Sequence, residues 1–86
     1  MLFMIHRKQL GAARGGLGIK QEKLAADSGV GLSTVRSFEK GPKVPGIENV
    51  KAIKEVLENE GARFTWRTTD DGRLFAGVEF EIKEDE

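Results

Sequence analysis

The stretch of residues 21–38 constrains the fold of this chain more than any other part. Two short helical segments are separated there by Gly29, the residue type that most readily adopts the left-handed conformation of a sharp turn. Ala25 is small enough to let the two helices approach closely at a steep angle. The apolar residues that would seal this pair onto other helices are Leu24, Val30, Val35 and Phe38. An ordinary helical hairpin would explain the apolar stripe, but not the spacing of Ala25, Gly29 and Val30.

Helices are also predicted before and after this pair. Residues 7–15 place Leu10 and Ala13 on one face, and the glycines at 15, 16 and 18 are expected to end that helix. Pro42 ends the helix predicted over residues 32–40, because the residue before a proline avoids helical geometry. A fourth helix is predicted over residues 47–60, and its apolar stripe consists of Ile47, Val50, Ile53, Val56 and Leu57.

The apolar pattern changes to alternation beyond residue 61, which predicts two strands joined by a turn at Asp70-Asp71-Gly72. The alternating residues of the second strand are Leu74, Ala76, Val78, Phe80 and Ile82. A two-residue loop would mix apolar and polar side chains on both faces. A three-residue loop instead pairs Trp66 with Ala76 and places Gly72 where a left-handed residue is needed. We therefore expect the three-residue loop.

The run QEKLAADSGVGLSTVRSFEKG resembles the helix-turn-helix of the phage-repressor-like (XRE, lambda-repressor-like) family, and the resemblance extends from about Ile5 to Phe64. It implies a mainly α fold, with a four-helix DNA-binding domain in residues 1–61 and a C-terminal β-hairpin with an acidic tail in residues 62–86. It also implies a transcriptional regulator that binds a palindromic operator in double-stranded DNA as a homodimer. The recognition helix, residues 32–40, would enter the major groove.

The resemblance assigns DNA contacts to two groups of side chains. Those expected to read base edges are Leu32, Ser33, Arg36 and Ser37. Those expected to contact phosphates are Arg14, Lys20, Gln21, Lys40 and Lys43. Because leucine and serine discriminate weakly between bases, Arg36 and DNA shape should carry much of the specificity. The family pattern also implies that Arg14 pairs with Glu39, joining the first helix to the end of the recognition helix.

Three predicted helix starts depart from the family pattern. Lys20, Gly31 and Gly46 stand where family members often carry a serine or threonine cap. Glycine costs only a few tenths of a kcal/mol relative to such a cap. A lysine, in contrast, meets the unfavourable end of the helix dipole. A nearby phosphate would turn Lys20 into a DNA contact, and a solvated surface lysine is the alternative.

Charge is distributed unevenly along this neutral chain. Up to Lys43 there are eight basic and three acidic residues, a net charge of +5. From Ala62 onward there are four basic and seven acidic residues, a net charge of −3. The basic part would therefore turn toward a polyanion such as DNA.

Enzymatic and membrane functions find little support in the sequence. It has no cysteine or tyrosine, and His6, its one histidine, falls at a predicted helix start. The glycine-rich residues 15–18 lack the Gly-Lys-Ser/Thr ending of a phosphate-binding loop, and a turn explains Asp70-Asp71 better than a metal site. The apolar residues 1–5 are too short for a signal peptide. We expect a cytoplasmic protein that is not an enzyme and that has no metal, no cofactor and no membrane contact.

The predicted hairpin needs a partner for its apolar face, because a lone two-stranded hairpin is marginally stable in water. We expect it to cover part of the helical domain and to pair with a second copy through dimerisation residues Trp66, Val78, Phe80 and Ile82. One alternative is a monomer whose hairpin only caps the core. Another is an antitoxin-like or adaptor protein of the same fold, whose hairpin binds a toxin-like protein partner.

Overall fold

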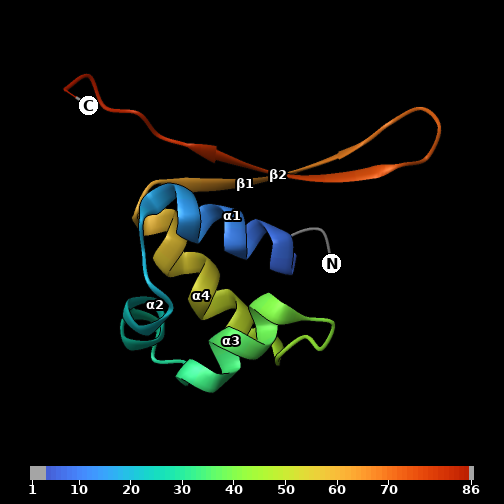
Figure 1. The fold of residues 1–86 in the computed structure, drawn as a ribbon. Coiled ribbons are helices and arrows are strands. Elements are labelled where there is room, and N and C mark those ends of the chain that lie inside the picture. Colours follow the sequence, from blue (N-terminus) through green and yellow to red (C-terminus); the bar gives the residue numbers. More distant parts are fainter. Residues whose placement is uncertain (1–3, 86) are drawn as a thin grey trace.

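Four helices precede one antiparallel hairpin in the structure, a computed structural model that describes residues 4–85. Residues 1–3 of the apolar N-terminal run and Glu86 of the acidic tail lie outside the described residues. The elements are α1 (Arg7–Leu17), α2 (Gln21–Ser28), α3 (Leu32–Lys40), α4 (Ile47–Asn59), β1 (Ala62–Thr68) and β2 (Leu74–Phe80). The predicted mainly α fold with a C-terminal hairpin is confirmed. Figure 1 shows the hairpin along one side of the helices, with α2 and α3 on the opposite side.

Helix α1 is longer than the sequence predicted. It continues through Gly15 and Gly16 to Leu17 and ends at Gly18, which has a φ of 70°. Glycine inside a helix costs only about 1 kcal/mol relative to alanine, so packing can outweigh it. Gly16 has such a packing role, because a Cβ atom placed there would lie 2.3 Å from the Phe80 ring. The missing side chain lets β2 approach α1 closely.

The core combines residues from all four helices and the start of β1. Its fully buried side chains include Leu10, Leu24, Val35, Phe38, Ile53 and Leu57. Ile47 was expected on the buried apolar stripe of α4, but it is 55% exposed, so the prediction for this residue was wrong. As the first residue of α4, Ile47 lies beyond the core and lines an apolar groove with Met4 and Trp66.

The hairpin has the predicted register. Trp66 is opposite Ala76, Phe64 is opposite Val78, and Gly72 has a φ of 85° in the connecting loop. Buried Gln9 fixes the hairpin to α1, since its Nε2 donates to the carbonyl oxygens of Thr65 (3.1 Å) and Gly77 (2.9 Å). The side chains of Phe64, Val78 and Phe80 pack against the helical core.

The residues expected to form a dimer contact differ in how far the protomer itself covers them. Val78 and Phe80 pack on the protomer's own helices, and the Trp66 Nε1 donates to the Met4 carbonyl oxygen at 3.1 Å. Ile82 lies beyond the end of β2 and is 73% exposed. The strand ends before Ile82 because Glu81 already pairs with Gly61, where the chain turns back into α4. The dimer contact through these four residues stays a prediction, and three of them are already partly covered by the protomer itself.

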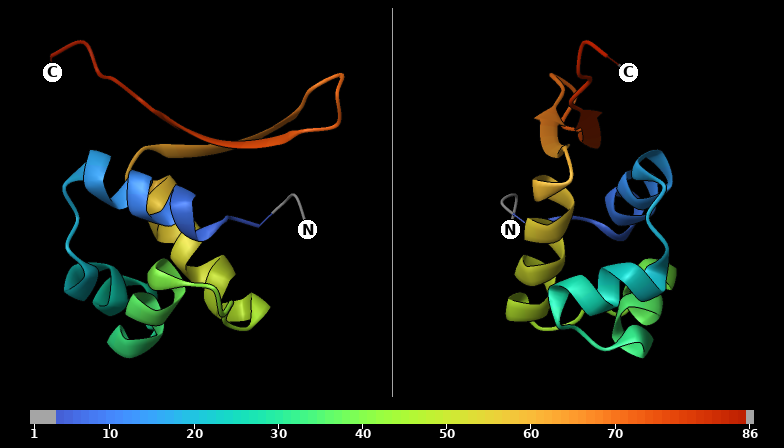
Figure 2. Two further views of the ribbon diagram at one scale, coloured as in Figure 1. Left: turned by 45° about the vertical axis from the view of Figure 1, so that its right-hand side comes forward. Right: turned by 90° about the vertical axis from the view of Figure 1, so that its left-hand side faces the viewer.

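The outer half of the hairpin projects beyond the helices as an arm (Figures 1 and 2). Leu74, expected on the covered apolar face, is 51% exposed because no helix lies beneath this part of the arm. On the other face of the arm, the Arg67 guanidinium lies 5.2 Å from the centre of the Phe75 ring. Such a cation–π contact stiffens an otherwise unsupported segment.

Candidate nucleic-acid interface

The two short helices α2 and α3 are joined by the predicted sharp turn. Gly29 has a φ of 72°, and its N–H donates to the Ala25 carbonyl oxygen at 3.0 Å. Ala25 is buried where the helices meet, and Val30 is buried just after the turn. Residues 21–38 thus form the two closely packed helices and the sharp turn that their sequence pattern predicted.

Helix α3 presents one polar face to the outside. Ser33, Arg36, Ser37 and Lys40 are all exposed, and their spacing places them on a single side of the helix. Val35 and Phe38 on the opposite side are 0% and 2% exposed. Helix α3 lies on the side of the molecule away from the hairpin (Figure 2), so the hairpin does not cover this face.

Leu32 does not belong to that exposed face. Its side chain is half-buried and packs against the core, next to the turn between α2 and α3. An apolar residue at this position gains more from covering the core than from contact with water. The structure therefore brings together three of the four expected base-reading residues and sets Leu32 apart.

The predicted bridge between α1 and α3 is confirmed. Arg14 Nε donates to Glu39 Oε1 at 2.8 Å, and Arg14 Nη2 donates to Glu39 Oε2 at 2.7 Å. Arg14 Nη1 also donates to the Ile19 carbonyl oxygen at 3.0 Å. These hydrogen bonds from Arg14 hold the pKa of Glu39 below its usual range. Gln21 Nε2 approaches the same carboxylate at 3.4 Å and so ties the start of α2 to the end of α3.

The bridge changes the expected role of Arg14. All three nitrogens of its guanidinium have partners within the protein, and its side chain is only 22% exposed. A phosphate would have to compete with a two-point carboxylate contact, one of the strongest hydrogen-bonding arrangements in proteins. Arg14 is thus placed to position α3 rather than to extend toward DNA.

Three helices begin without a side-chain cap. The N-cap residues of α2, α3 and α4 are Lys20, Gly31 and Gly46, and none makes a side-chain capping hydrogen bond. Helix α1, in contrast, is capped by His6, whose Nδ1 accepts from the Lys8 N–H at 3.1 Å. The first-turn N–H groups of an uncapped helix are natural donors to an anion such as phosphate.

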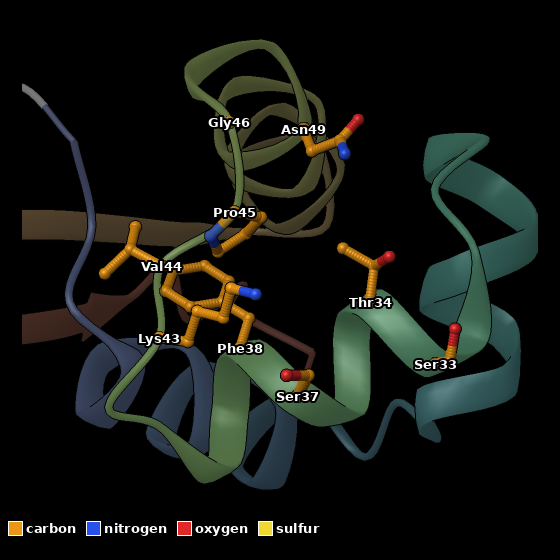
Figure 3. Close-up of a pocket in the computed structure, with 9 residues that line it drawn as sticks. All are labelled: Ser33, Thr34, Ser37, Phe38, Lys43, Val44, Pro45, Gly46 and Asn49. Carbon is orange, nitrogen blue, oxygen red and sulfur yellow. The ribbon is translucent and has the colours of Figure 1, made fainter.

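A shallow hollow of about 490 Å³ lies between α3 and the start of α4 (Figure 3). Ser33, Ser37 and Thr34 line it from α3, and Lys43 and Asn49 line it from the following loop and α4. Thr34 and Asn49 were not identified from the sequence. Asn49, in the first turn of a helix without a cap and close to Lys43, carries the signal that could have indicated it.

Arg36 has a neighbour that the sequence analysis also missed. Its Nη2 lies 3.8 Å from Glu22 Oε2, and both side chains are more than half exposed, at 56% and 65%. Such a long, solvated ion pair contributes little and breaks readily. Arg36 can therefore turn away to another partner, and Glu22 places a negative charge beside the exposed face of α3.

The described part of the chain offers two further observations. None of its helices is both long and apolar enough to cross a membrane. Within residues 4–85, no group of three or more histidine, cysteine, aspartate or glutamate side chains is placed to hold a metal ion.

Comparison with known protein families identifies a match. A family model described as helix-turn-helix matches residues 10–61, more than half of the chain, from within α1 to just beyond α4. No curated protein shows significant similarity to the chain.

Proposed function

The chain belongs to the XRE-type helix-turn-helix family of DNA-binding transcription regulators, and on this premise we propose that it binds a palindromic operator as a homodimer. In this proposal α3 enters the major groove with its exposed face toward the base edges. The observation that carries the proposal is that Ser33, Arg36, Ser37 and Lys40 form a continuous polar face backed by the core.

Base reading falls to three residues of that face. Arg36 can bond to the O6 and N7 atoms of a guanine, the commonest specific contact in the major groove. Ser33 and Ser37 can serve donor or acceptor edges of any base and therefore discriminate weakly. DNA shape would supply the remaining specificity.

Phosphate binding falls to the side chains and helix starts around α3. Lys20, Lys40 and Lys43 are exposed, and Gln21 lies at the first position of α2. Phosphate oxygens would accept hydrogen bonds from the uncapped N–H groups of α2, α3 and α4. A cation at position 20, unfavourable beside the helix dipole alone, would become favourable next to a phosphate. These contacts fix the register of the protein on DNA without reading sequence.

Salt dependence on a duplex of arbitrary sequence tests the phosphate contacts. We expect binding that falls steeply with salt, because each neutralised phosphate releases counterions. Lys43→Ala should lower the slope of log affinity against log salt by about 1 for every sequence tried. Arg63→Ala is the matched control, because Arg63 lies on the hairpin, on the side away from α3, and is 83% exposed. Equal slopes for Lys43→Ala and the unmodified chain would refute this part of the proposal.

A further inference from the structure

Strand β2 has an edge that no other strand covers within residues 4–85, where the sheet consists of β1 and β2. The hydrogen bonds at the two ends of the hairpin show which groups lie on that edge. Thr69 N donates to the Arg73 carbonyl oxygen at 2.8 Å, and Glu81 N donates to the Gly61 carbonyl oxygen at 2.9 Å. Both bonds join odd-numbered residues, and in an antiparallel pair the bonding direction alternates along each strand. The N–H and C=O groups of Leu74, Ala76, Val78 and Phe80 therefore point away from β1.

We propose that this edge pairs antiparallel with the same edge of a second copy, with Gly77 of one protomer opposite Gly77 of the other. The inference rests on the homodimer of the proposed function and names its contact surface and register. On the face toward the helices, this register places Ala76 opposite Val78 and Leu74 opposite Phe80. On the outer face it places Arg73 opposite Glu81, once on each side of the two-fold axis. Opposite charges directly across two strands stabilise their pairing.

Neighbouring registers are worse. Moving the axis to Ala76 places Arg73 opposite Glu79, but it also places Asp71 opposite Glu81, which sets two carboxylates against each other. Moving it to Val78 places Arg73 opposite Lys83, which sets two cations against each other. A shift of a single residue in the pairing would put the apolar face of one copy against the outer face of the other. Of these registers, only the one about Gly77 combines matched faces with an opposite-charge pair and no like-charge pair between residues 71 and 83.

The edge of β1 is guarded against the same kind of pairing. This strand carries Arg63 and Arg67 and no acidic residue, so a second β1 would bring together four cations. Pairing about Thr65 would place Arg63 directly opposite Arg67. Like charges on an edge strand are a common protection against self-association. The two edges of this hairpin thus differ, and only β2 is complementary to itself.

Helix α1 carries two small residues beside the hairpin. Gln9, Ala12 and Gly16 share one face of α1 by their spacing. Gln9 contacts Gly77, and Gly16 lies against Phe80. Ala12 lies between them and is exposed. At positions 12 and 16 this flank of α1 therefore carries a small side chain or none.

The proposed pairing also orients the DNA-binding faces. Adjacent antiparallel strands are related by a two-fold axis perpendicular to their sheet, so both sets of helices lie on the same side of the four-stranded sheet. In each protomer α3 lies on the side away from the hairpin (Figure 2). Both recognition helices then face in the same direction, as binding to one operator requires.

Charge exchange across the axis tests the register. The dimer dissociation constant of the full chain is measured by light scattering over a concentration series. We expect Arg73→Glu and Glu81→Arg each to weaken the dimer by about tenfold, because each change acts at both symmetric positions. The double variant R73E/E81R should return to within about threefold of the unmodified chain. Lys51→Glu, an equal charge change at an exposed position of α4, is the matched control and should have no effect.

Backbone blocking tests the edge itself. Ala76→Pro removes an N–H that points away from β1, so each hairpin keeps its own hydrogen bonds while the pairing of the two copies loses two, one on each side of the axis. Ala76→Val keeps that N–H and controls for side-chain size. We expect Ala76→Pro to be monomeric at concentrations where Ala76→Val is dimeric. Thermal unfolding monitors whether each variant folds.

Three results would overturn the inference: a monomeric unmodified chain at high micromolar concentration, a double charge variant as weak as the single ones, or a dimeric Ala76→Pro variant. If the chain dimerises and binds a palindrome while the charge variants have no effect, the proposed function stands and the register fails. If Arg73→Glu and Ala76→Pro behave as expected but no operator is found, the register stands and the proposed function fails.

Discussion

At the scale of single residues, the bridge between Arg14 and Glu39 sets the position of the recognition helix. The pair is bidentate, and both side chains are about one-fifth exposed, at 22% and 21%. The contribution of this ion pair to the free energy of unfolding should lie between that of an exposed pair and that of a buried pair. We expect Arg14→Ala to lower the free energy of unfolding by about 1–3 kcal/mol in urea titrations followed by circular dichroism. Arg14→Lys should recover only part of the loss, because lysine lacks the two-point geometry. An Arg14→Ala variant as stable as the unmodified chain would contradict this role.

The same bridge should make stability depend on pH in the acid range. Folding lowers the pKa of Glu39 because the carboxylate accepts hydrogen bonds from Arg14. A lowered pKa in the folded state means stability that is present above the unfolded pKa of about 4.3 and is lost as pH falls below it. The difference in unfolding free energy between the unmodified chain and Glu39→Gln should therefore be constant from about pH 7 to 5 and shrink below about pH 4. If the difference in unfolding free energy between the two proteins persisted at pH 3, the ionised carboxylate of Glu39 would not be its source.

Glu22 is expected to oppose DNA binding. Its carboxylate lies 3.8 Å from Arg36 in the free protein and beside the face that would meet phosphates. Glu22→Gln should strengthen DNA binding by about three- to tenfold at low salt, with less gain at high salt where charges are screened. Glu58→Gln is the control, because Glu58 pairs with Lys54 near the hairpin end of α4. Fluorescence anisotropy on a labelled duplex would measure both, and weaker binding by Glu22→Gln would refute the expectation.

Residue roles were predictable only where a recognisable pattern fixed them. The partnership of Arg14 and Glu39 followed from the resemblance to a family, and it is confirmed by their 2.7 Å contact. The consequence for Arg14 depends on the three-dimensional structure, in which Glu39 and the Ile19 carbonyl oxygen occupy its nitrogens. Glu22 and Arg36 lie 14 positions apart on two helices, and no periodicity in the sequence relates them.

At the scale of elements, α1 is the support on which the hairpin rests. Gly16 lies directly against the Phe80 ring, whereas a Cβ on Gly15 would meet nothing within 4 Å. Gly15→Ala should therefore stabilise the protein by about 0.5–1 kcal/mol through helix propensity. Gly16→Ala should destabilise it relative to Gly15→Ala, because the Phe80 ring and β2 must shift. Urea unfolding followed by Trp66 fluorescence measures both, and equal stability of the two variants would show that Gly16 has no packing role.

The sequence predicted the elements well where one signal dominated. The bounds of α2 and α3 follow from glycine and proline at their ends, and the hairpin register follows from face matching and Gly72. The prediction for α1 was wrong at its C-terminus because local propensity treated Gly15 and Gly16 as breakers. Gly16 contacts Phe80, which lies 64 positions away in the sequence. This contact decides where α1 ends, and rules that consider only neighbouring residues cannot include it.

At the scale of the whole molecule, charge is divided unevenly among the elements, and α1 beside the hairpin holds three residues of the basic part, Arg7, Lys8 and Arg14. Residues up to Lys43, which form α1 to α3 and the following loop, carry a net charge of +5, and the hairpin with its tail carries −3. The hairpin and α3 lie on opposite sides of the helical core (Figure 1). DNA would attract the side that bears α3 and repel the side that bears the acidic tail. The order of charged residues along the chain predicted this charge separation. The projecting arm and the exposure of Leu74 were not predictable in this way, because they depend on how far β2 extends past the helices.

Selection of bound sequences from a random DNA pool at low salt tests the central claim most directly. We expect one enriched palindromic motif whose half-sites lie about one helical turn apart, ~34–36 Å, because two copies of α3 would occupy successive major grooves on one face. The same selection with Arg36→Ala should lose the strongest base preference in each half-site while retaining general affinity. A pool that shows no enriched motif with the unmodified chain would contradict the account.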